Sequence, residues 1–130
     1  MDSPSAIAKL LTAIVMVAER KGVTHLKIVP AGTGAVVYHW CGAGWQEELA
    51  TETAPLHMHL MRHLATQLSA EIPPPGNTRI GQFSLQWPDG RAIHVLGAID
   101  HDFEVAAYLE LVDGETFASG RAPRSPQAPS

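Results

Sequence analysis

Apolar residues recur three or four positions apart in two stretches of the chain, which is the spacing of an α-helix with one buried face. The first stretch predicts a helix over residues 4–21, with Ser3 as a suitable N-cap, Pro4 at the first helical position and Gly22 as the residue that stops it. The second stretch predicts a helix over residues 55–70. The apolar positions of the two helices are Ile7, Leu10, Leu11, Ile14, Val17 and Ala18, and Leu56, Leu60, Met61, Leu64 and Leu68.

A second pattern, in which apolar and polar residues alternate, is typical of half-buried β-strands. It is clearest near the N-terminal end, where Leu26 and Ile28 alternate with His25 and Lys27. Glycine pairs and the turn signal Pro88-Asp89-Gly90 separate the candidate strands. The expected strands span residues 24–29, 35–40, 45–49, 79–87, 91–98 and 104–112.

The order of these elements is a helix, two strands, a short third strand, a helix and three strands. Strands joined by short links pair antiparallel, and the apolar faces of two helices need a sheet to cover. We therefore expect an α+β fold of the PAS-like type, αββ(β)αβββ, with a mostly antiparallel sheet and both helices packed on it. Residues 1–112 form a single domain in this interpretation. Residues 113–130 are rich in Pro, Ser, Ala and Gly and are expected to be a disordered tail.

Composition and charge narrow the class of protein. The 130 residues carry a formal charge of −4, and the nine Lys and Arg residues form no run, which argues against nucleic acid as a partner. Cys41 is the single cysteine, so an intrachain disulfide is excluded. The apolar stretch of residues 6–18 has no cationic segment before it and is too short to span a bilayer. We expect a cytoplasmic protein that does not insert into membranes.

Motifs that would support catalysis are missing from the sequence. The glycine pairs Gly32-Thr33-Gly34 and Gly42-Ala43-Gly44 do not extend to a dinucleotide-binding motif, and no phosphate-binding loop follows a strand. His39 and Cys41 lack a third orienting group and an oxyanion hole. We therefore expect no self-sufficient catalytic site and no cofactor.

The histidine-rich segment from His57 to His63 raises the question of a metal site. On a helix, His59 and His63 share a face, whereas His57 points about 160° away from His59. His59 and His63 are therefore weak candidates for metal ligands, without the acidic residue of a zinc-protease helix or a clear third ligand. A solvated polar face is the simpler interpretation, and His57 is expected to pack near the helix start.

Two tryptophans near strand ends are the candidate partner-binding residues. Trp40 and Trp45 are large aromatic side chains on either side of the turn at Gly42 and Gly44. Core packing is one interpretation, and a patch that contacts a partner is the other. The sequence leaves both open.

Several segments resemble the domain that precedes the motor of type II secretion and type IV pilus ATPases. Residues 23–30 (VTHLKIVP) resemble the ASDIHIEP segment that opens this domain, and residues 36–42 (VVYHWCG) resemble its VRYRIDG strand and turn. Residues 55–64 are similar to its next helix, 75–80 to its PQDGRI segment and 91–96 to REIDVR. The order and spacing hold from about residue 6 to 112.

The charged positions of that family are mostly replaced, while its apolar frame is kept. Residues that stand where the family has charged side chains are His25, Lys27, Val29, Val37, His39, Cys41, His94 and Leu96. The motor is absent, so the resemblance implies a PAS-like fold without the nucleotide role. The expected function is a non-catalytic protein-interaction domain, an adaptor or regulator tied to a secretion or pilus machine, with a protein partner or a homodimer. A PAS-like or roadblock-like small-ligand sensor and a histidine-based metal-binding protein are the alternatives.

Overall fold

The computed structural model describes residues 4–32, 34–51 and 56–126. The predicted N-cap Ser3 and the predicted helix start at residue 55 lie outside these ranges. The elements are α1 (Pro4–Arg20), β1 (His25–Ala31), β2 (Gly34–Trp40), β3 (Trp45–Ala50), α2 (Leu56–Gln67), β4 (Asn77–Gln86), β5 (Ala92–His101), β6 (Val105–Val112) and α3 (Gly114–Ser119).

The strands of the described part of the chain form one six-stranded sheet in the order β3-β2-β1-β6-β5-β4. Each pair of neighbours is antiparallel, and the first and last strands of the chain, β1 and β6, lie side by side in its centre. The expected α+β class with a mostly antiparallel sheet is therefore confirmed. The third strand, which the sequence indicated least clearly, pairs with β2.

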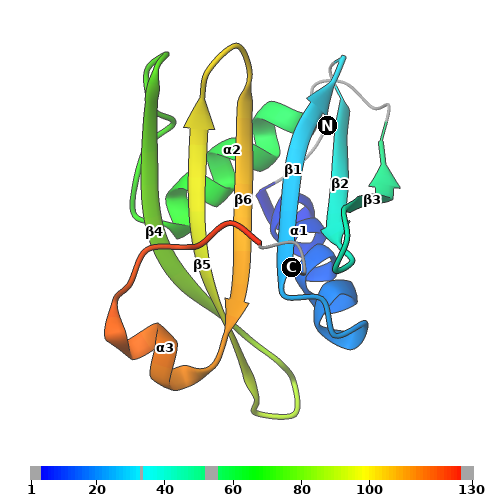
Figure 1. The fold of residues 1–130 in the computed structure, drawn as a ribbon, viewed down its shortest axis with the longest axis vertical. Coiled ribbons are helices and arrows are strands. Elements are labelled where there is room, and N and C mark those ends of the chain that lie inside the picture. The colour runs from blue at the N-terminus through cyan, green and yellow to red at the C-terminus, as the bar shows by residue number, and fades with distance from the viewer. Residues whose placement is uncertain (1–3, 33, 52–55, 127–130) are drawn as a thin grey trace.

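Helices α1 and α2 lie behind the sheet in Figure 1 and cover one of its faces, here called the helix face. Alternation sends Leu26 and Ile28 of β1 to this face, and both are fully buried. Leu60, Met61 and Leu64 of α2 meet them in the same apolar core. The hydrophobic pattern of the sequence therefore identified most of the core, although Val17, on the predicted apolar face of α1, is 39% exposed.

The ends of α1 and α2 share one backbone arrangement, the Schellman motif. After α1, the Val23 N–H donates to the Ala18 carbonyl, and Gly22 has the left-handed φ of 70° that its predicted role as helix stop requires. After α2, the Ala70 N–H donates to the Ala65 carbonyl, and Ser69 takes φ 55°. The predicted end of α2 at residue 70 is therefore wrong, because Ser69 adopts a conformation that glycine usually supplies.

Two glycines paired across β4 and β5 let the end of α2 approach the sheet. Gly81 and Gly97 are partners in the register. A Cβ on Gly81 would lie 2.6 Å from the Leu68 carbonyl oxygen, and one on Gly97 would lie 3.0 Å from a Leu68 methyl group. No side chain fits at Gly81 without moving the helix end, so these glycines fix the distance between helix and sheet.

The prediction of a disordered tail from residue 113 is wrong for residues 113–126. Helix α3 occupies Gly114–Ser119, with Asp113 as N-cap accepting from the Thr116 N–H at 2.7 Å and Gly120 in the left-handed region at its end. The chain then crosses in front of the sheet, on the side opposite α1 and α2 (Figure 1). Composition favours disorder here, but specific contacts with the sheet, described below, hold the segment.

Candidate partner-binding face of the sheet

The face of the sheet opposite α1 and α2, here called the open face, carries the side chains that alternate with the core residues. Lys27 of β1 stands beside Tyr38 of β2 on one side and Tyr108 of β6 on the other in the strand register. His25 stands beside Glu110 in the next row. Side chains in one row of a sheet point to the same face, so polar and aromatic groups of three strands gather here.

An aromatic patch, defined as Tyr38, Trp40 and Trp45 with Lys27, lies at the β2–β3 end of the open face. Trp40 and Trp45 are register partners, and their rings meet edge to face with centroids 5.3 Å apart. The Lys27 ammonium lies 4.7 Å from the Trp45 ring centroid and 5.1 Å from that of Tyr38. All four side chains are partly exposed. The structure thus brings the two predicted partner-binding residues together and adds a cation that their π-systems attract.

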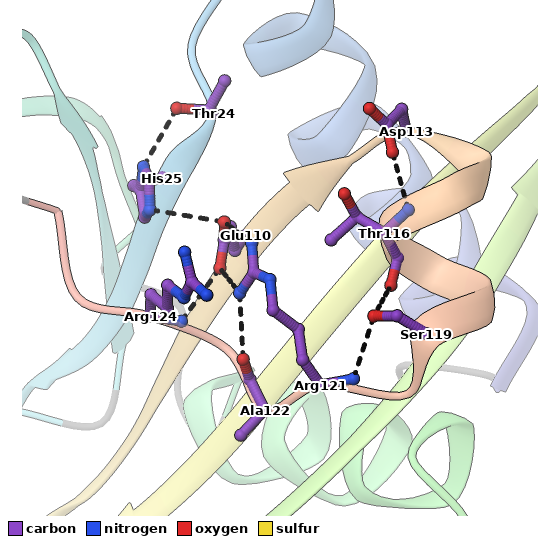
Figure 2. Close-up of polar contacts among 9 residues, drawn as sticks. All are labelled: Thr24, His25, Glu110, Asp113, Thr116, Ser119, Arg121, Ala122 and Arg124. Atoms are coloured by element: carbon purple, nitrogen blue, oxygen red, sulfur yellow. Dashed lines mark hydrogen bonds and ion pairs between the residues drawn. The ribbon is translucent and has the colours of Figure 1, made fainter.

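Glu110 of β6 is the polar centre of the open face, and sequence reasoning missed it. Its side chain is 10% exposed and binds the chain that follows α3. Arg121 donates to both carboxylate oxygens, at 3.0 and 2.7 Å, and the Arg124 N–H donates at 2.8 Å. His25 Nε2 lies 3.9 Å away. Figure 2 shows these groups converging on the carboxylate from β1 and from the crossing segment.

The contacts of Glu110 keep it ionised despite its burial. Burial alone raises the pKa of a carboxyl group, but the hydrogen bonds from Arg121 and from the Arg124 amide outweigh it, and the pKa of Glu110 falls below its ordinary value. A paired guanidinium and carboxylate form two parallel hydrogen bonds, which fix geometry as well as charge. The ion pair and hydrogen bonds at Glu110, here called the latch, therefore hold the segment after α3 to β6 at one point.

The crossing segment of residues 121–126 forms one wall of a groove on the open face. The sheet side is lined by His25, Trp45 and Tyr108, among others, and the segment side by Pro123 and Pro126. About 130 Å³ of space remains between the two walls. The segment therefore covers the groove without filling it.

Helix α3 anchors the segment at the β5 end of the same face. The Phe117 ring stacks on the His94 ring of β5, with centroids 4.6 Å apart and planes inclined by 29°. Leu96, a register partner of Glu110, points to the open face but is fully buried. Helix α3 and the segment after it therefore cover part of the open face, while the aromatic patch and Tyr108, which is 41% exposed, keep aromatic surface free.

In the described part of the structure, no further ligands join His59 and His63, the candidate metal ligands. His59 and His63 are partly buried on α2, and burial lowers the pKa of His63. Within residues 4–32, 34–51 and 56–126, no three His, Cys, Asp or Glu side chains gather in a way that could hold a metal ion.

His57 is buried, as its position near the start of α2 predicted. It is 3% exposed, and its Nε2–H donates to the Val105 carbonyl at 2.6 Å, because a carbonyl oxygen accepts only. Its Nδ1 has no hydrogen-bond partner among the described residues. Burial lowers the pKa of His57, against smaller opposing effects of the Val105 carbonyl and Glu104. The ring is therefore a neutral part of the core.

A second groove lies on the helix side, between α1 and the edge of β2 and β3. Val17 and Leu49 line it, and His39 and Glu48 lie at its polar end. His39 is 2% exposed, with Nδ1 3.8 Å from Glu48, which also pairs with Lys21. The groove holds about 160 Å³, roughly half of the smallest usual ligand pocket of about 300 Å³. It does not favour the small-ligand sensor over the interaction domain.

Comparison with known proteins gives no relative that would assign a role to these sites. No family model matches the chain, and no curated protein matches it. In addition, none of the helices in the described part of the chain is long and apolar enough to cross a membrane.

Proposed function

We propose that this chain is a non-catalytic protein-interaction domain that contacts its partner through the open face of its sheet. The observation that carries the proposal is the aromatic patch. Trp40 and Trp45 pack edge to face, remain partly exposed and adjoin a lysine. Tryptophan, tyrosine and arginine dominate the energies of protein interfaces, and rings already held in place lose little entropy on binding.

The division of the sheet into two faces supports the same proposal. The helix face is filled by a continuous apolar core, so folding does not require the aromatic groups of the open face to be where they are. A tryptophan pair kept partly in water contributes less to stability than a buried one. Such surface is typical of an interaction site.

The cellular setting is the second part of the proposal. We propose a cytoplasmic adaptor or regulator of a secretion or type IV pilus machine, on the strength of the sequence resemblance described above. Three residues that replace charged positions of that family, His25, Lys27 and His94, belong to strand positions of the open face. A duplicated domain that exchanged a nucleotide-binding role for protein contacts would change such positions first.

The test is a binding experiment with matched variants. The full chain, tagged, serves as bait for the cytoplasmic components of secretion and pilus machines, and captured proteins are then measured by calorimetry. Trp40→Ala should weaken the complex by a factor of ten or more, because truncating a central interface aromatic costs about 2 kcal/mol or more. Ile80→Ala changes an exposed apolar residue of the same face far from the patch and should have no effect.

Two outcomes would contradict the proposal. If Trp40→Ala folds normally and binds the partner as tightly as the unchanged chain, the patch is not the interface. If the full chain binds none of the tested proteins and stays monomeric in light scattering, the functional class itself is wrong. A homodimer that Trp40→Ala dissociates would identify a second copy as the partner.

A further inference from the structure

The crossing segment consists of two copies of the same short pattern, Arg121-Ala122-Pro123 and Arg124-Ser125-Pro126. Both prolines are partly buried, while the residues between them are exposed. No helix or strand forms over residues 121–126. Proline side chains three positions apart lie on one side of a polyproline II helix, which has three residues per turn. The segment therefore has the composition and the spacing of an extended recognition peptide.

The surface beneath the segment has the groups that such a peptide needs. The Glu110 carboxylate accepts hydrogen bonds from the Arg121 guanidinium and from the Arg124 N–H, so it contacts both a side chain and the backbone. The Trp45 and Tyr108 side chains line the groove occupied by the prolines. Aromatic walls for proline and a carboxylate for arginine are the elements by which grooves bind proline-rich segments.

We infer that this groove, centred on Glu110, is a receptor site for an extended partner segment bearing an Arg-X-Pro pattern, and that residues 121–126 are its resident occupant. The inference rests on the proposed function, since it names the partner chemistry for the open face. The resident segment leaves about 130 Å³ of the groove unfilled, so a partner with a larger side chain after its arginine gains contacts that the resident lacks.

Displacement of the resident segment is energetically reasonable. A tethered segment competes at an effective concentration in the millimolar range, so it blocks weak ligands and yields to better ones. The Arg121 side chain is 25% exposed. Among the described contacts, Arg124 binds Glu110 through its backbone N–H and not through its side chain. The latch is thus one ion pair and one backbone hydrogen bond, next to the α3 anchor at His94 and Phe117.

The experiment measures binding of a fluorescent peptide with the sequence of residues 120–126 by anisotropy. The receptors are the full chain and the full chain with Arg121→Ala and Arg124→Pro, which removes both the ion pair and the backbone N–H that hold the resident segment. The released variant should bind the peptide at least tenfold more tightly than the unchanged chain. Adding Glu110→Gln to the released variant should weaken binding at least tenfold.

A peptide in which both arginines are alanine is the control that needs no change in the protein, so it holds even if Glu110→Gln affects folding. It should bind at least tenfold more weakly than the parent peptide. The effective concentration of the tethered segment is roughly 1 mM. If the released variant does not bind the peptide at that concentration, the inference is wrong. Equal binding of the two peptides also overturns it. Tail exchange that produces a dimer of the unchanged chain would make a second copy the occupant and overturn a separate partner.

The same data separate this inference from the proposed function. Trp40 does not line the groove but packs on Trp45, which does, so the released variant with Trp40→Ala added is first shown to bind the peptide unchanged, and Trp40→Ala then tests the patch alone. If the peptide does not bind but Trp40→Ala abolishes partner binding, the interaction function stands and the groove is wrong. If the peptide binds as expected but Trp40→Ala changes no complex, the groove stands and the patch is wrong.

Discussion

The two faces of the sheet are covered in different ways, although the same strands build both. On the helix face, α1 and α2 bury a continuous apolar core in which residues such as Leu26, Ile28 and Leu64 have no exposed surface. On the open face, a short helix and an extended segment cover part of the sheet through a carboxylate, two arginines and one aromatic stack. The first cover is non-directional and cooperative, and the second depends on a few directional contacts.

This difference separates folding from recognition. Apolar burial gives roughly 25 cal/mol per Å² and needs only matching shape, so the helix face stabilises the whole domain. A charge-assisted hydrogen bond contributes about 1.5–3 kcal/mol and is lost when one partner leaves. A segment held mainly by such bonds can detach while the domain stays folded, which is the behaviour required of a replaceable occupant. Changes on the two faces should therefore have different consequences.

The largest effect is expected from a cavity on the helix face. Leu64→Ala removes a fully buried side chain of α2 from the core and should lower the free energy of unfolding by about 2–5 kcal/mol. Urea unfolding followed by circular dichroism measures it. The matched change on the open face, Ile80→Ala, alters a residue that is 56% exposed and should cost less than about 0.5 kcal/mol. Equal losses for the two variants would mean that the faces do not differ as described.

A smaller effect is expected where α2 meets the sheet. Gly81→Ala places a Cβ against the Leu68 carbonyl oxygen, and the resulting shift of the helix end should cost about 1–3 kcal/mol. Gly44→Ala is the control, because a Cβ there meets nothing within 4 Å and Gly44 has no left-handed φ. Urea unfolding again gives the values. A Gly81→Ala protein as stable as the Gly44→Ala protein would show that the helix end moves freely.

The third prediction concerns the latch on the open face. Glu110→Gln keeps the shape of the side chain but removes its charge, so the Arg121 fork should weaken by about 1–2 kcal/mol. Hydrogen exchange should show faster exchange in residues 121–126, with little change in the core strands. Glu115→Gln, on the exposed side of α3, is the control and should leave exchange unchanged. Uniformly faster exchange across the core would mean that the segment is part of the cooperative fold.

Acid should have the same effect on the latch as Glu110→Gln. The pKa of Glu110 lies below its ordinary value of 4.5, so the stabilisation from its ionised form is complete above that value. It is lost as the pH falls through the lowered pKa, when the carboxylate takes up a proton. The protection of residues 121–126, measured relative to the intrinsic exchange rate at each pH, should therefore decrease below pH 4.5 in the unchanged chain and stay constant in Glu110→Gln. A loss of protection of the same size in both proteins would assign the acid effect to other groups.

The sequence was a good guide to the helix face. Alternation at Leu26 and Ile28 and the helical spacing of Leu60 and Leu64 are local patterns with one physical meaning, and the structure confirms them. The end of α2 was not predictable, because Ser69 takes a left-handed φ and serine is not a residue type that indicates this conformation. The end of β5 was also missed.

The β5 error has a clear physical reason. The strand predicted to end at residue 98 continues through Asp100 and His101. Asp100 accepts a hydrogen bond from Thr78 of β4 at 2.7 Å, and His101 Nδ1 lies 2.7 Å from the Pro73 carbonyl. These contacts come from a neighbouring strand and a distant loop, which a local pattern does not include.

The open face was largely missed because its key residues act through long-range placement. Trp40 and Trp45 were found by residue type, but Glu110 and Arg121 gain their meaning only once β6 and the crossing segment meet. A signal for α3 was present: Asp113 and Gly120 bracket a short segment containing Phe117, which is the pattern of a capped helix. The overall composition of the tail concealed it.

The smallest effect is expected from His57 and concerns pH. Its neutral ring is buried, its Nδ1 has no hydrogen-bond partner among the described residues, and burial lowers its pKa below the ordinary 6.5. The unfolded chain therefore takes up a proton from pH 6.5 downward before the folded one does, so stability is full above 6.5 and falls as the pH drops toward the lowered pKa. The slope from one such group is at most about 1.4 kcal/mol per pH unit. His39, which is buried, and His63, which is partly buried, also have lowered pKa values and act in the same direction. Urea unfolding of the unchanged chain between pH 8 and 5.5 measures the combined slope, and His57→Gln, which keeps a donor for the Val105 carbonyl but does not titrate, should reduce it. The difference between the two proteins at pH 8 gives the cost of the substitution itself. An unchanged slope in His57→Gln would show that the buried ring takes up its proton without disturbing the helix face.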